Sequence, residues 1–481
     1  MGGSRPPNRA GYTQRMRDLS ALIKAYDIRG IVPDQWDSRL AREVGIAFVE
    51  VLKIREIDGG AGQLVVGHDM RPTGPDLVAA FIAGVNSAGV DVINIGLCST
   101  DGLYFASGRL NMPGAMFTAS HNPAEYNGIK LCRAGAAPVG QDSGLAEIRL
   151  MLESENLPEW TGEVGTSTNR DMLADYSAFL RELVPLDGNR QLKVVIDTGN
   201  GMGGFTVPAV LGNQVLPSLP IEIDELYFEL DGTFPNHEAN PIEPANLVDL
   251  QKRVLGEKAD LGIAFDGDAD RAFFIDEKGQ SITPSAITAL IAKRELKREP
   301  GSTIIHNLIT SRSVAEVVKE NGGSARKTRV GHSFIKQVMK DTNAIFGGEH
   351  SGHFYFRDFW FADSGMLAAL HVLAALGETK DGTTFSSLIK EFDRYVASGE
   401  INTRVKDVSV TSKKVKEHFA GSKDVQIEEL DGLTFSGDTW WVNVRPSNTE
   451  PLLRLNAEAK EHATMEKVRD EVLAIIRKDA Q

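Results

Sequence analysis

The chain has little cysteine and no long apolar run. Only two cysteines, Cys98 and Cys132, occur among 481 residues. Two cysteines cannot form a stabilising disulfide framework, which excludes a disulfide-rich secreted scaffold and favours a reducing compartment. No stretch reaches the roughly 18 apolar residues that a membrane-spanning helix needs; the most apolar segment, residues 365–376, is shorter and contains His371. We therefore expect a cytoplasmic protein without membrane contact.

Basic residues are also scarce. The 52 Lys and Arg residues are outnumbered by 66 Asp and Glu residues, and the formal net charge is −14. Generic nucleic-acid binding needs a basic surface, so we expect no nucleic-acid partner. With 42% hydrophobic and 25% charged residues, the composition is that of an ordinary globular protein. At about 150 residues per domain, the length predicts roughly three domains.

The N-terminal segment lacks the apolar stretch of a secretory signal. Pro6 stands where a myristoylation motif requires Ser or Thr. Because the segment is polar, basic and rich in Gly and Pro, we predict a flexible tail over residues 1–20.

Three stretches of the chain repeat one pattern, in which a β-branched run ends in a polar loop and is followed by a helix. The runs span 64–69, 193–197 and 302–307, with helices at 76–87, 202–211 and 313–321. Each unit continues with a second apolar run that opens into a Gly- or Asp-rich loop, at 114–117, 261–265 and 344–346. Alternating strands and helices predict α/β layers with largely parallel sheets.

The last stretch, from about residue 398, has a different pattern. Strands are predicted at 439–444 and 451–458, and apolar residues at helical spacing predict a terminal helix over 463–478. This predicts a smaller α+β domain. With linkers at 156–169, 277–280 and 395–400, we expect domains over 21–165, 166–278, 279–395 and 396–481.

The loop DGDADR carries three alternating carboxylates, Asp266, Asp268 and Asp270. Crowded carboxylate oxygens suit a hard divalent cation such as Mg²⁺, and without one they repel each other. An EF-hand begins with the same spacing, and Glu277 falls at its twelfth position. However, Arg271 stands where that loop requires Gly, and a strand precedes it. A solvated acidic turn is the other alternative.

The loop TASHNP, residues 118–123, follows a predicted strand. Small polar residues and a Pro are typical of a tight turn, whereas the functional interpretation is a nucleophilic Ser120. The adjacent His121 does not make a Ser–His dyad, because neighbouring strand residues point to opposite faces. There is no G-x-S-x-G motif either. Lys130 follows and could act as acid or base if its pKa is lowered.

Two further polar loops follow predicted strands. GGEHSGH, residues 347–353, could bind zinc, although its glycines disfavour an HExxH helix. Alternatively, Glu349 and Ser351 could bind sugar hydroxyls, while His350 is interpreted as structural. RPSNTEP, residues 445–451, offers an Arg fork, hydroxyls and main-chain N–H groups for a phosphate, or it is simply a polar hairpin.

Together the four loops supply groups for a metal, a nucleophile, a polyol and a phosphate, which indicates phosphoryl transfer on a phosphosugar. In this order they resemble the α-D-phosphohexomutase superfamily. KAYDIRG at 24–30 and Gly331-His332 extend the resemblance over nearly the whole chain after about residue 20. The GEHSGH form is similar to the bacterial phosphomannomutase/phosphoglucomutase branch, since phosphoglucosamine mutases usually carry Gln at the position of His350.

The resemblance implies three related α/β domains with mixed sheets and a smaller α+β C-terminal domain around a central cleft. It implies that Ser120 carries the phosphoryl group and that, with Asp266, Asp268 and Asp270, it holds Mg²⁺. The other implied site residues are Lys130 as acid/base; Arg29, His121, Arg271 and His332 beside it; Glu349, Ser351 and His353 at the sugar; and Arg445, Ser447, Asn448 and Thr449 at the non-reacting phosphate.

The implied reaction interconverts hexose 6-phosphate and hexose 1-phosphate, of mannose and also of glucose, through hexose 1,6-bisphosphate as intermediate and activator. We expect a monomer or homodimer, with a cleft made positive by Arg29, Lys130, Arg271 and Arg445. The alternatives are a phosphoglucosamine mutase, a phosphatase or phosphotransferase that uses Asp266 as nucleophile with Asp268 assisting, and a non-enzymatic divalent-cation protein.

Overall fold

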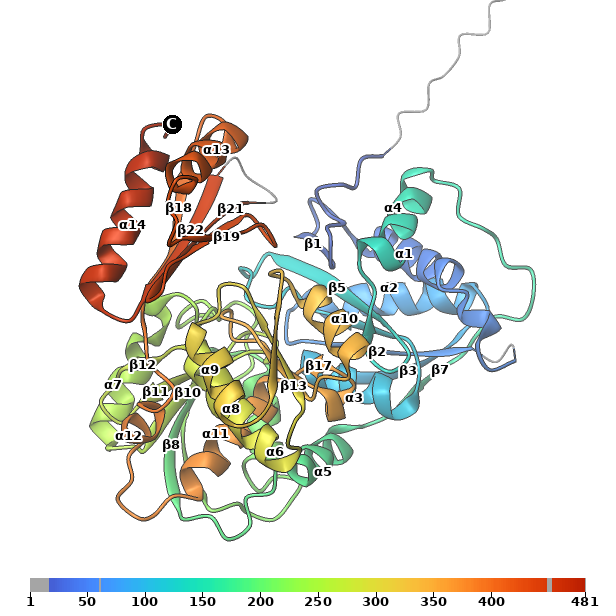
Figure 1. Cartoon of the computed structure of the whole chain (residues 1–481). Coiled ribbons are helices and arrows are strands. Elements are labelled where there is room, and N and C mark those ends of the chain that lie inside the picture. Colours follow the sequence, from blue (N-terminus) through green and yellow to red (C-terminus); the bar gives the residue numbers. More distant parts are fainter. Residues whose placement is uncertain (1–16, 60–61, 448–451, 481) are drawn as a thin grey trace, which may run out of the picture.

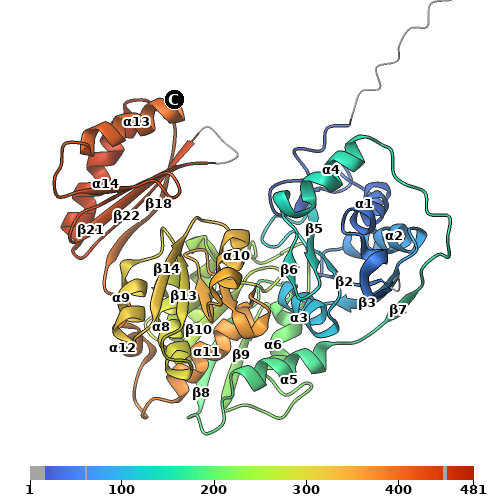
Figure 2. The same ribbon diagram turned by 45° about the vertical axis from the view of Figure 1, so that its right-hand side comes forward.

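The computed structural model describes residues 17–59, 62–447 and 452–480, and it contains three α/β domains and a smaller fourth domain (Figures 1 and 2). Apolar runs form buried central strands, as predicted: Val65 and Val66 in the first domain and Ile304 and Ile305 in the third are all fully buried. No helix in the described ranges is long and apolar enough to cross a membrane.

The first domain has a seven-stranded mixed sheet in the order β1-β5-β4-β2-β3-β7, with β6 attached to β5. Strands β2, β3, β4 and β7 run parallel, whereas β5 is antiparallel to β1 and β4. Its elements are β1 (Ile28–Ile31), α1 (Ser38–Val51), η1 (Ile54–Gly59), β2 (Gln63–His68), α2 (Gly74–Ser87), β3 (Asp91–Leu97), α3 (Thr100–Leu110), β4 (Gly114–Phe117), β5 (Tyr126–Arg133), β6 (Ala137–Pro138), η2 (Gln141–Ser143), α4 (Leu145–Glu153) and β7 (Ser167–Asn169).

The second domain has a five-stranded sheet in the order β12-β11-β10-β8-β9. Parallel strands β9, β8 and β10 are followed by the antiparallel hairpins β10–β11 and β11–β12. Its elements are α5 (Leu173–Leu183), β8 (Leu192–Asp197), α6 (Gly203–Val210), β9 (Ile221–Leu226), η3 (Pro244–Leu247), α7 (Val248–Glu257), β10 (Leu261–Phe265), β11 (Ala272–Asp276) and β12 (Ser281–Ile282).

The third domain repeats this arrangement in the order β14-β13-β15-β16-β17, with β13 parallel to both neighbours and β16 antiparallel to both of its own. Its elements are α8 (Pro284–Arg298), β13 (Thr303–Asn307), α9 (Arg312–Glu320), β14 (Ser324–Thr328), α10 (His332–Thr342), β15 (Phe346–Gly348), β16 (Phe354–Phe356), η4 (Arg357–Phe359), β17 (Ala362–Asp363), α11 (Gly365–Gly377) and α12 (Phe385–Ile389).

The fourth domain is an antiparallel sheet in the order β18-β22-β21-β20-β19, packed against two helices. Figure 1 shows it in red at the upper left, above the green and yellow middle of the molecule and across from the blue first domain. Its elements are β18 (Val396–Arg404), α13 (Val408–Phe419), β19 (Gln426–Glu428), β20 (Leu433–Ser436), β21 (Trp440–Pro446), β22 (Leu452–Ala459) and α14 (His462–Arg477).

The predicted linkers and tail differ from the structure where short strands form. The segment 156–169 ends in β7, which pairs with β3, so the first domain extends past the predicted boundary at residue 165. The turn 277–280 lies inside the β11–β12 hairpin, so the second domain extends past the predicted boundary at residue 278. The segment 395–400 is largely the start of β18 rather than a linker. In the predicted tail, Arg17 pairs with Glu43 on α1 and Leu19 is buried, while residues 1–16 lie outside the described ranges.

One continuous core of buried side chains runs through the first three domains and includes Met116, Phe265 and Leu370, beside further clusters within the single domains. The fourth domain has a separate core, and a small apolar contact of Trp441 with Leu308 and Ile309 joins it to the third domain. The loops after β4, β10 and β15 therefore extend from strands of domains that share this core, whereas the loop after β21 extends from a strand of the separately packed fourth domain.

Candidate active site

Ser120 lies in the loop after β4 and faces the loop after β10. Its backbone has φ of +50°, a left-handed conformation that non-glycine residues rarely adopt, and its side chain is buried. The Oγ atom donates a hydrogen bond to Asp266 Oδ2 at 2.8 Å and accepts one from Arg271 at 3.2 Å. The two loops thus place a hydroxyl between a carboxylate and a guanidinium.

Asp266, Asp268 and Asp270 form a buried cluster whose ligand atoms lie within 4.8 Å of one another. The solvated-turn interpretation is therefore wrong. Glu277 is turned away to Ser386, whose main-chain N and Oγ donate to it, so no EF-hand forms. Burial raises the pKa of Asp266. Burial acts the same way on Asp268, but Lys130 and Thr100 hold its pKa below the ordinary value.

Two carboxylate oxygens of this cluster are available to a cation. Asp268 Oδ1 and Asp270 Oδ1 are buried and have no hydrogen-bond partner among the described residues. Buried acceptors without partners are costly unless a bound ion or water satisfies them. Three buried carboxylates, two of which have such an oxygen, form the donor set that suits a hard divalent cation.

Lys130 on β5 donates to Asp268 Oδ2 at 2.7 Å and to Asp270 Oδ2 at 2.6 Å. Burial alone lowers the pKa of Lys130, but the two carboxylates raise it well above its ordinary value. This direction is opposite to the one that the acid/base interpretation of the sequence required. In this arrangement Lys130 is a charged proton donor.

His121 packs against the same guanidinium as Ser120. Arg271 contacts His121 Nδ1 and also donates to Asp266 Oδ2 at 2.7 Å. Burial, together with Arg271 and Arg29, lowers the pKa of His121 to about 2, so its imidazole is neutral. His121 Nδ1 lies 3.2 Å from Ser120 Oγ, which shows that the left-handed turn does bring these adjacent side chains together.

Arg29 lies next to the serine loop, where it donates to Asn122 Oδ1 at 2.6 Å and pairs with Asp27. Arg71 was not found from the sequence. It follows β2, is almost fully buried, and donates to the main-chain carbonyls of Ser120, Asn122, Pro123 and Tyr126 at 2.6–2.9 Å. Its position at the end of a buried strand was the only available signal.

Glu349 in the loop after β15 is buried and accepts hydrogen bonds from Tyr355 at 2.9 Å and Ser351 at 3.4 Å. Its other oxygen accepts from Asn307 at 3.3 Å. Asn307 also contacts His350 Nδ1 at 3.1 Å, in agreement with a structural role for that histidine. The loop lies between β15 and β16, so no HExxH helix forms.

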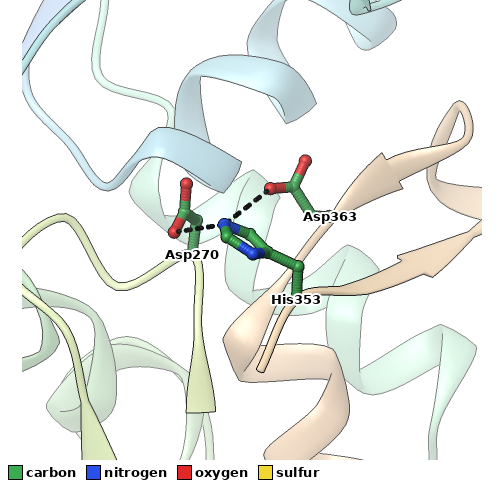
Figure 3. Close-up of side chains that lie close together, drawn as sticks. All are labelled: Asp270, His353 and Asp363. Carbon is green, nitrogen blue, oxygen red and sulfur yellow. Dashed lines mark ion pairs between the residues drawn. The ribbon is translucent and has the colours of Figure 1, made fainter. Parts of the chain in front are cut away.

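His353, at the end of the loop 347–353, lies beside the carboxylate cluster (Figure 3). Its Nε2 lies 3.6 Å from Asp270 and 4.0 Å from Asp363, a residue not found from the sequence. Asp363 also pairs at 2.6 Å with Lys336, which is buried against the ring of Tyr104. Burial lowers the pKa of His353 to about 4, so this imidazole is also neutral.

Arg445 lies at the end of β21, away from Ser120, and pairs with Glu400 at 2.6 Å. With Ser447 it lines a cavity of about 920 Å³, whose opposite wall comes from the first domain through Lys24, Tyr26 and Arg149. Asn448 and Thr449 lie outside the described residues, and so does the side chain of His332, whose backbone begins α10.

The four basic residues that were expected to make the cleft positive are all paired with carboxylates. Arg29, Lys130, Arg271 and Arg445 each have a carboxylate partner: Asp27, Asp268 and Asp270, Asp266, and Glu400, respectively. Buried charges are paired because isolated ones are too costly to desolvate. The site is therefore a network of ion pairs rather than a basic patch.

Four family models match nearly the whole chain. Models of phosphoglucomutase/phosphomannomutase alpha/beta/alpha domains I, II and III match residues 20–157, 174–279 and 283–395, and the model of the C-terminal domain matches 400–475. The chain is 37% identical over 454 residues to phosphohexose mutases of Xanthomonas campestris pv. campestris, which covers 94% of this chain and 98% of that protein. The chain belongs to the phosphoglucomutase/phosphomannomutase family.

Other family members agree in length and fold. A phosphomannomutase of Vibrio cholerae is 38% identical over 467 residues, 96% of this chain and 99% of that protein. The crystal structure of a phosphoglucomutase/phosphomannomutase family protein from Burkholderia thailandensis has a TM-score of 0.84 and 31% identity, covering 96% of this chain and 98% of that one. The predicted fold class and superfamily are confirmed, and the chain is a phosphohexomutase.

Proposed function

We propose that this phosphohexomutase interconverts hexose 6-phosphate and hexose 1-phosphate through a phosphoserine at Ser120 and a hexose 1,6-bisphosphate. The observation that carries the proposal is the placement of Ser120 Oγ, 2.8 Å from Asp266 and 3.2 Å from Arg271. A serine so placed can pass a phosphoryl group while fixed charges surround it, which is most of what phosphoryl transfer requires.

In the first half-reaction, a substrate hydroxyl oxygen forms a bond to phosphorus and the bond from phosphorus to Ser120 Oγ breaks. The hydroxyl loses a proton and Ser120 Oγ regains one. Lys130 is the proposed proton carrier: the two carboxylates keep it protonated, it can give its proton to Ser120 Oγ, and it then takes up the proton that the substrate hydroxyl loses. Arg271 contacts Ser120 Oγ and stabilises negative charge there. The bisphosphate then turns over and returns its other phosphate to Ser120.

The residues present fit a divalent cation, since buried Asp268 Oδ1 and Asp270 Oδ1 accept no hydrogen bond within the described part of the chain. We propose that Asp266, Asp268 and Asp270 hold Mg²⁺ together with Ser120. When bound, Mg²⁺ neutralises charge on the transferred phosphoryl group. Arg271, which pairs with Asp266, would lie beside the transferred phosphoryl group.

We propose that the substrate contacts both the third and the fourth domain. In this proposal, the sugar hydroxyls bind to three residues of the third domain, Glu349, Ser351 and His353. The phosphate that does not react binds to four residues of the fourth domain, Arg445, Ser447, Asn448 and Thr449. The 920 Å³ cavity between Arg445 and the first domain has room for a hexose phosphate. Because these groups do not single out C2, both mannose and glucose phosphates are proposed substrates.

A coupled mutase assay with mannose 1-phosphate, glucose 1-phosphate and glucosamine 1-phosphate, each with a trace of hexose bisphosphate, tests the proposal. Turnover of the first two is expected, with activity abolished in Ser120→Ala and retained in Ser422→Ala, an exposed serine of the fourth domain. Preference for the amino sugar would favour a phosphoglucosamine mutase instead. Substantial turnover by Ser120→Ala would contradict the phosphoserine.

A further inference from the structure

The first turn of α3, in the first domain, contacts the carboxylate loop of the second. Thr100 Oγ1 donates to Asp268 Oδ2 at 2.6 Å, and Thr100 N donates to the main-chain carbonyl of Asp268 at 3.0 Å. Both residues are fully buried. A neutral hydroxyl therefore orients this carboxylate from a different domain.

The hydrogen bonds to Asp268 divide its two oxygens. Oδ2 accepts from Thr100 and from Lys130, whereas Oδ1 is buried without a hydrogen-bond partner in the described ranges. Lys130 carries a positive charge and competes with a cation for the carboxylate. The hydroxyl of Thr100 holds the same oxygen without that repulsion, so it can keep Oδ1 available to a metal ion.

Thr100 stands on a rigid support, because its neighbour Asp101 is fixed by three domains. The buried Asp101 carboxylate accepts hydrogen bonds from Ser99 of its own domain, from Tyr176 of the second domain at 2.8 Å and from Ser364 of the third at 2.6 Å. Ser364 also caps α11 through the N–H of Leu367. Thr100 cannot readily follow a movement of the carboxylate loop, so the loop is held to Thr100.

We propose that Thr100 is a positioning residue that presents Asp268 to the divalent cation. The inference rests on the proposed function, because it takes Asp266, Asp268 and Asp270 to be the metal ligands. Partners that orient metal ligands typically contribute 10- to 100-fold in metal affinity. Loss of the Thr100 hydroxyl leaves Lys130 as the only side chain that holds Asp268 within the described residues.

Calorimetric titration of the full chain with Mn²⁺ alone, a spectroscopically and calorimetrically convenient stand-in for Mg²⁺, tests the proposal. Thr100→Val keeps the shape and removes the hydroxyl, and it should weaken Mn²⁺ binding about tenfold or more. Thr100→Ser restores the hydroxyl and should bind nearly as the wild type does. Thr206→Val is the matched control, since the hydroxyl of buried Thr206 donates to the Met202 carbonyl of its own domain, at 3.2 Å, rather than to a carboxylate of the cluster; the Mn²⁺ affinity of this variant should not change.

Thermal unfolding without metal separates positioning from stability. We expect Thr100→Val and Thr206→Val to unfold at similar temperatures, while only the first loses Mn²⁺ affinity. Should Thr100→Val fail to fold, Thr100→Ala takes its place. Unchanged Mn²⁺ affinity in the folded variant, with an active and metal-binding wild type, would overturn the inference and leave the proposed function standing. A wild type that neither binds Mn²⁺ nor interconverts phosphohexoses would instead overturn the proposed function.

Discussion

Arg71 holds the serine loop in its left-handed conformation through four main-chain carbonyls. Its Nε lies 3.3 Å from Asp69, and both side chains are completely buried. The guanidinium is suited to this task because its donors form a planar fork that a lysine lacks. Arg71 thus connects the end of β2 to the position of Ser120 without touching the Ser120 side chain.

Arg71→Lys should keep the charge beside Asp69 but lose most of the carbonyl hydrogen bonds. We expect a lower melting temperature and a kcat reduced by at least tenfold, because the serine loop loses its fixed geometry. Arg181→Lys is the control, since Arg181 also donates to three carbonyls, those of Val210, Gly212 and Pro217, away from the site. It should lower the melting temperature with kcat unchanged. Equal kcat values in both variants would contradict this role of Arg71.

The residues that carry charge or a hydroxyl in conspicuous loops could be predicted from the sequence, and Ser120, Asp266, Asp268 and Asp270 do lie together. Arg71, Thr100 and Asp363 could not, because each acts through a partner that is distant in the sequence. Lys130 was likewise predicted only in part. Its place in the site followed from the sequence, but the upward shift of its pKa is caused by two carboxylates from another domain.

At the scale of elements, the site exists because the loops after β4 and β10 approach each other at a glycine. A Cβ atom on Gly267 would lie 2.4 Å from the main-chain oxygen of Ser120, closer than any real contact. Gly267→Ala should therefore displace the serine loop, lower kcat strongly and destabilise the protein. Gly256→Ala is the control: its Cβ would meet nothing within 4 Å in α7.

In Gly256→Ala, the alanine should raise stability by about 0.5–1 kcal/mol and leave activity unchanged, because Gly is unfavourable inside a helix. Steady-state kinetics and thermal unfolding of both variants are the measurements. Full activity in Gly267→Ala would show that the two loops do not depend on this close approach.

Elements with an apolar period were predictable, and those created by pairing were not. Strands β2, β8, β10 and β13 and helix α14 follow from apolar runs and helical spacing within a few residues. Strand β7 consists of three exposed residues, and β12 consists of one exposed and one half-buried residue. Each forms by pairing with the edge of a neighbouring strand, β3 for β7 and β11 for β12. No period in the sequence marks such strands, which is why the predicted linkers overlapped them.

At the scale of the whole molecule, Asp101 joins the first three domains through buried hydrogen bonds from Tyr176 and Ser364. Burial, with a smaller contribution from Asp270, raises the pKa of Asp101 to about 6 from 3.8. The folded protein then binds this proton more tightly than the unfolded chain does. The resulting stability is present at low pH and is lost as the pH rises from about 4 through about 6.

At roughly 1.4 kcal/mol per pKa unit, the loss amounts to at most about 3 kcal/mol. Denaturant unfolding of the wild type and Asp101→Asn at several pH values isolates it, because other titrating groups cancel in the difference. The wild type should lose stability relative to Asp101→Asn between pH 4 and 7. A difference with the opposite slope would mean that the hydrogen bonds from the hydroxyl groups outweigh burial and lower the pKa of Asp101.

The domain count and the change of pattern near residue 398 were predictable, but the shared core of the first three domains was not. That core depends on which faces the α/β units turn to one another, and side chains such as Phe265 and Leu370 look the same in sequence whether they face their own domain or a neighbour. The fourth domain, which carries Arg445, has a core of its own, and this separation agrees with the change of pattern in the sequence.

Transfer of a phosphoryl group to Ser120 is the central claim, and mapping the phosphate on the protein tests it most directly. The protein is incubated with hexose 1,6-bisphosphate and Mg²⁺, digested under acid, and analysed by mass spectrometry, with Ser120→Ala treated in parallel. An acid-stable phosphate on the peptide that contains Ser120, absent from the variant, is the predicted result. Phosphate that is present on the intact protein but is released by acid, as an acyl phosphate on Asp266 would be, or full turnover without phosphate on Ser120, would contradict the account.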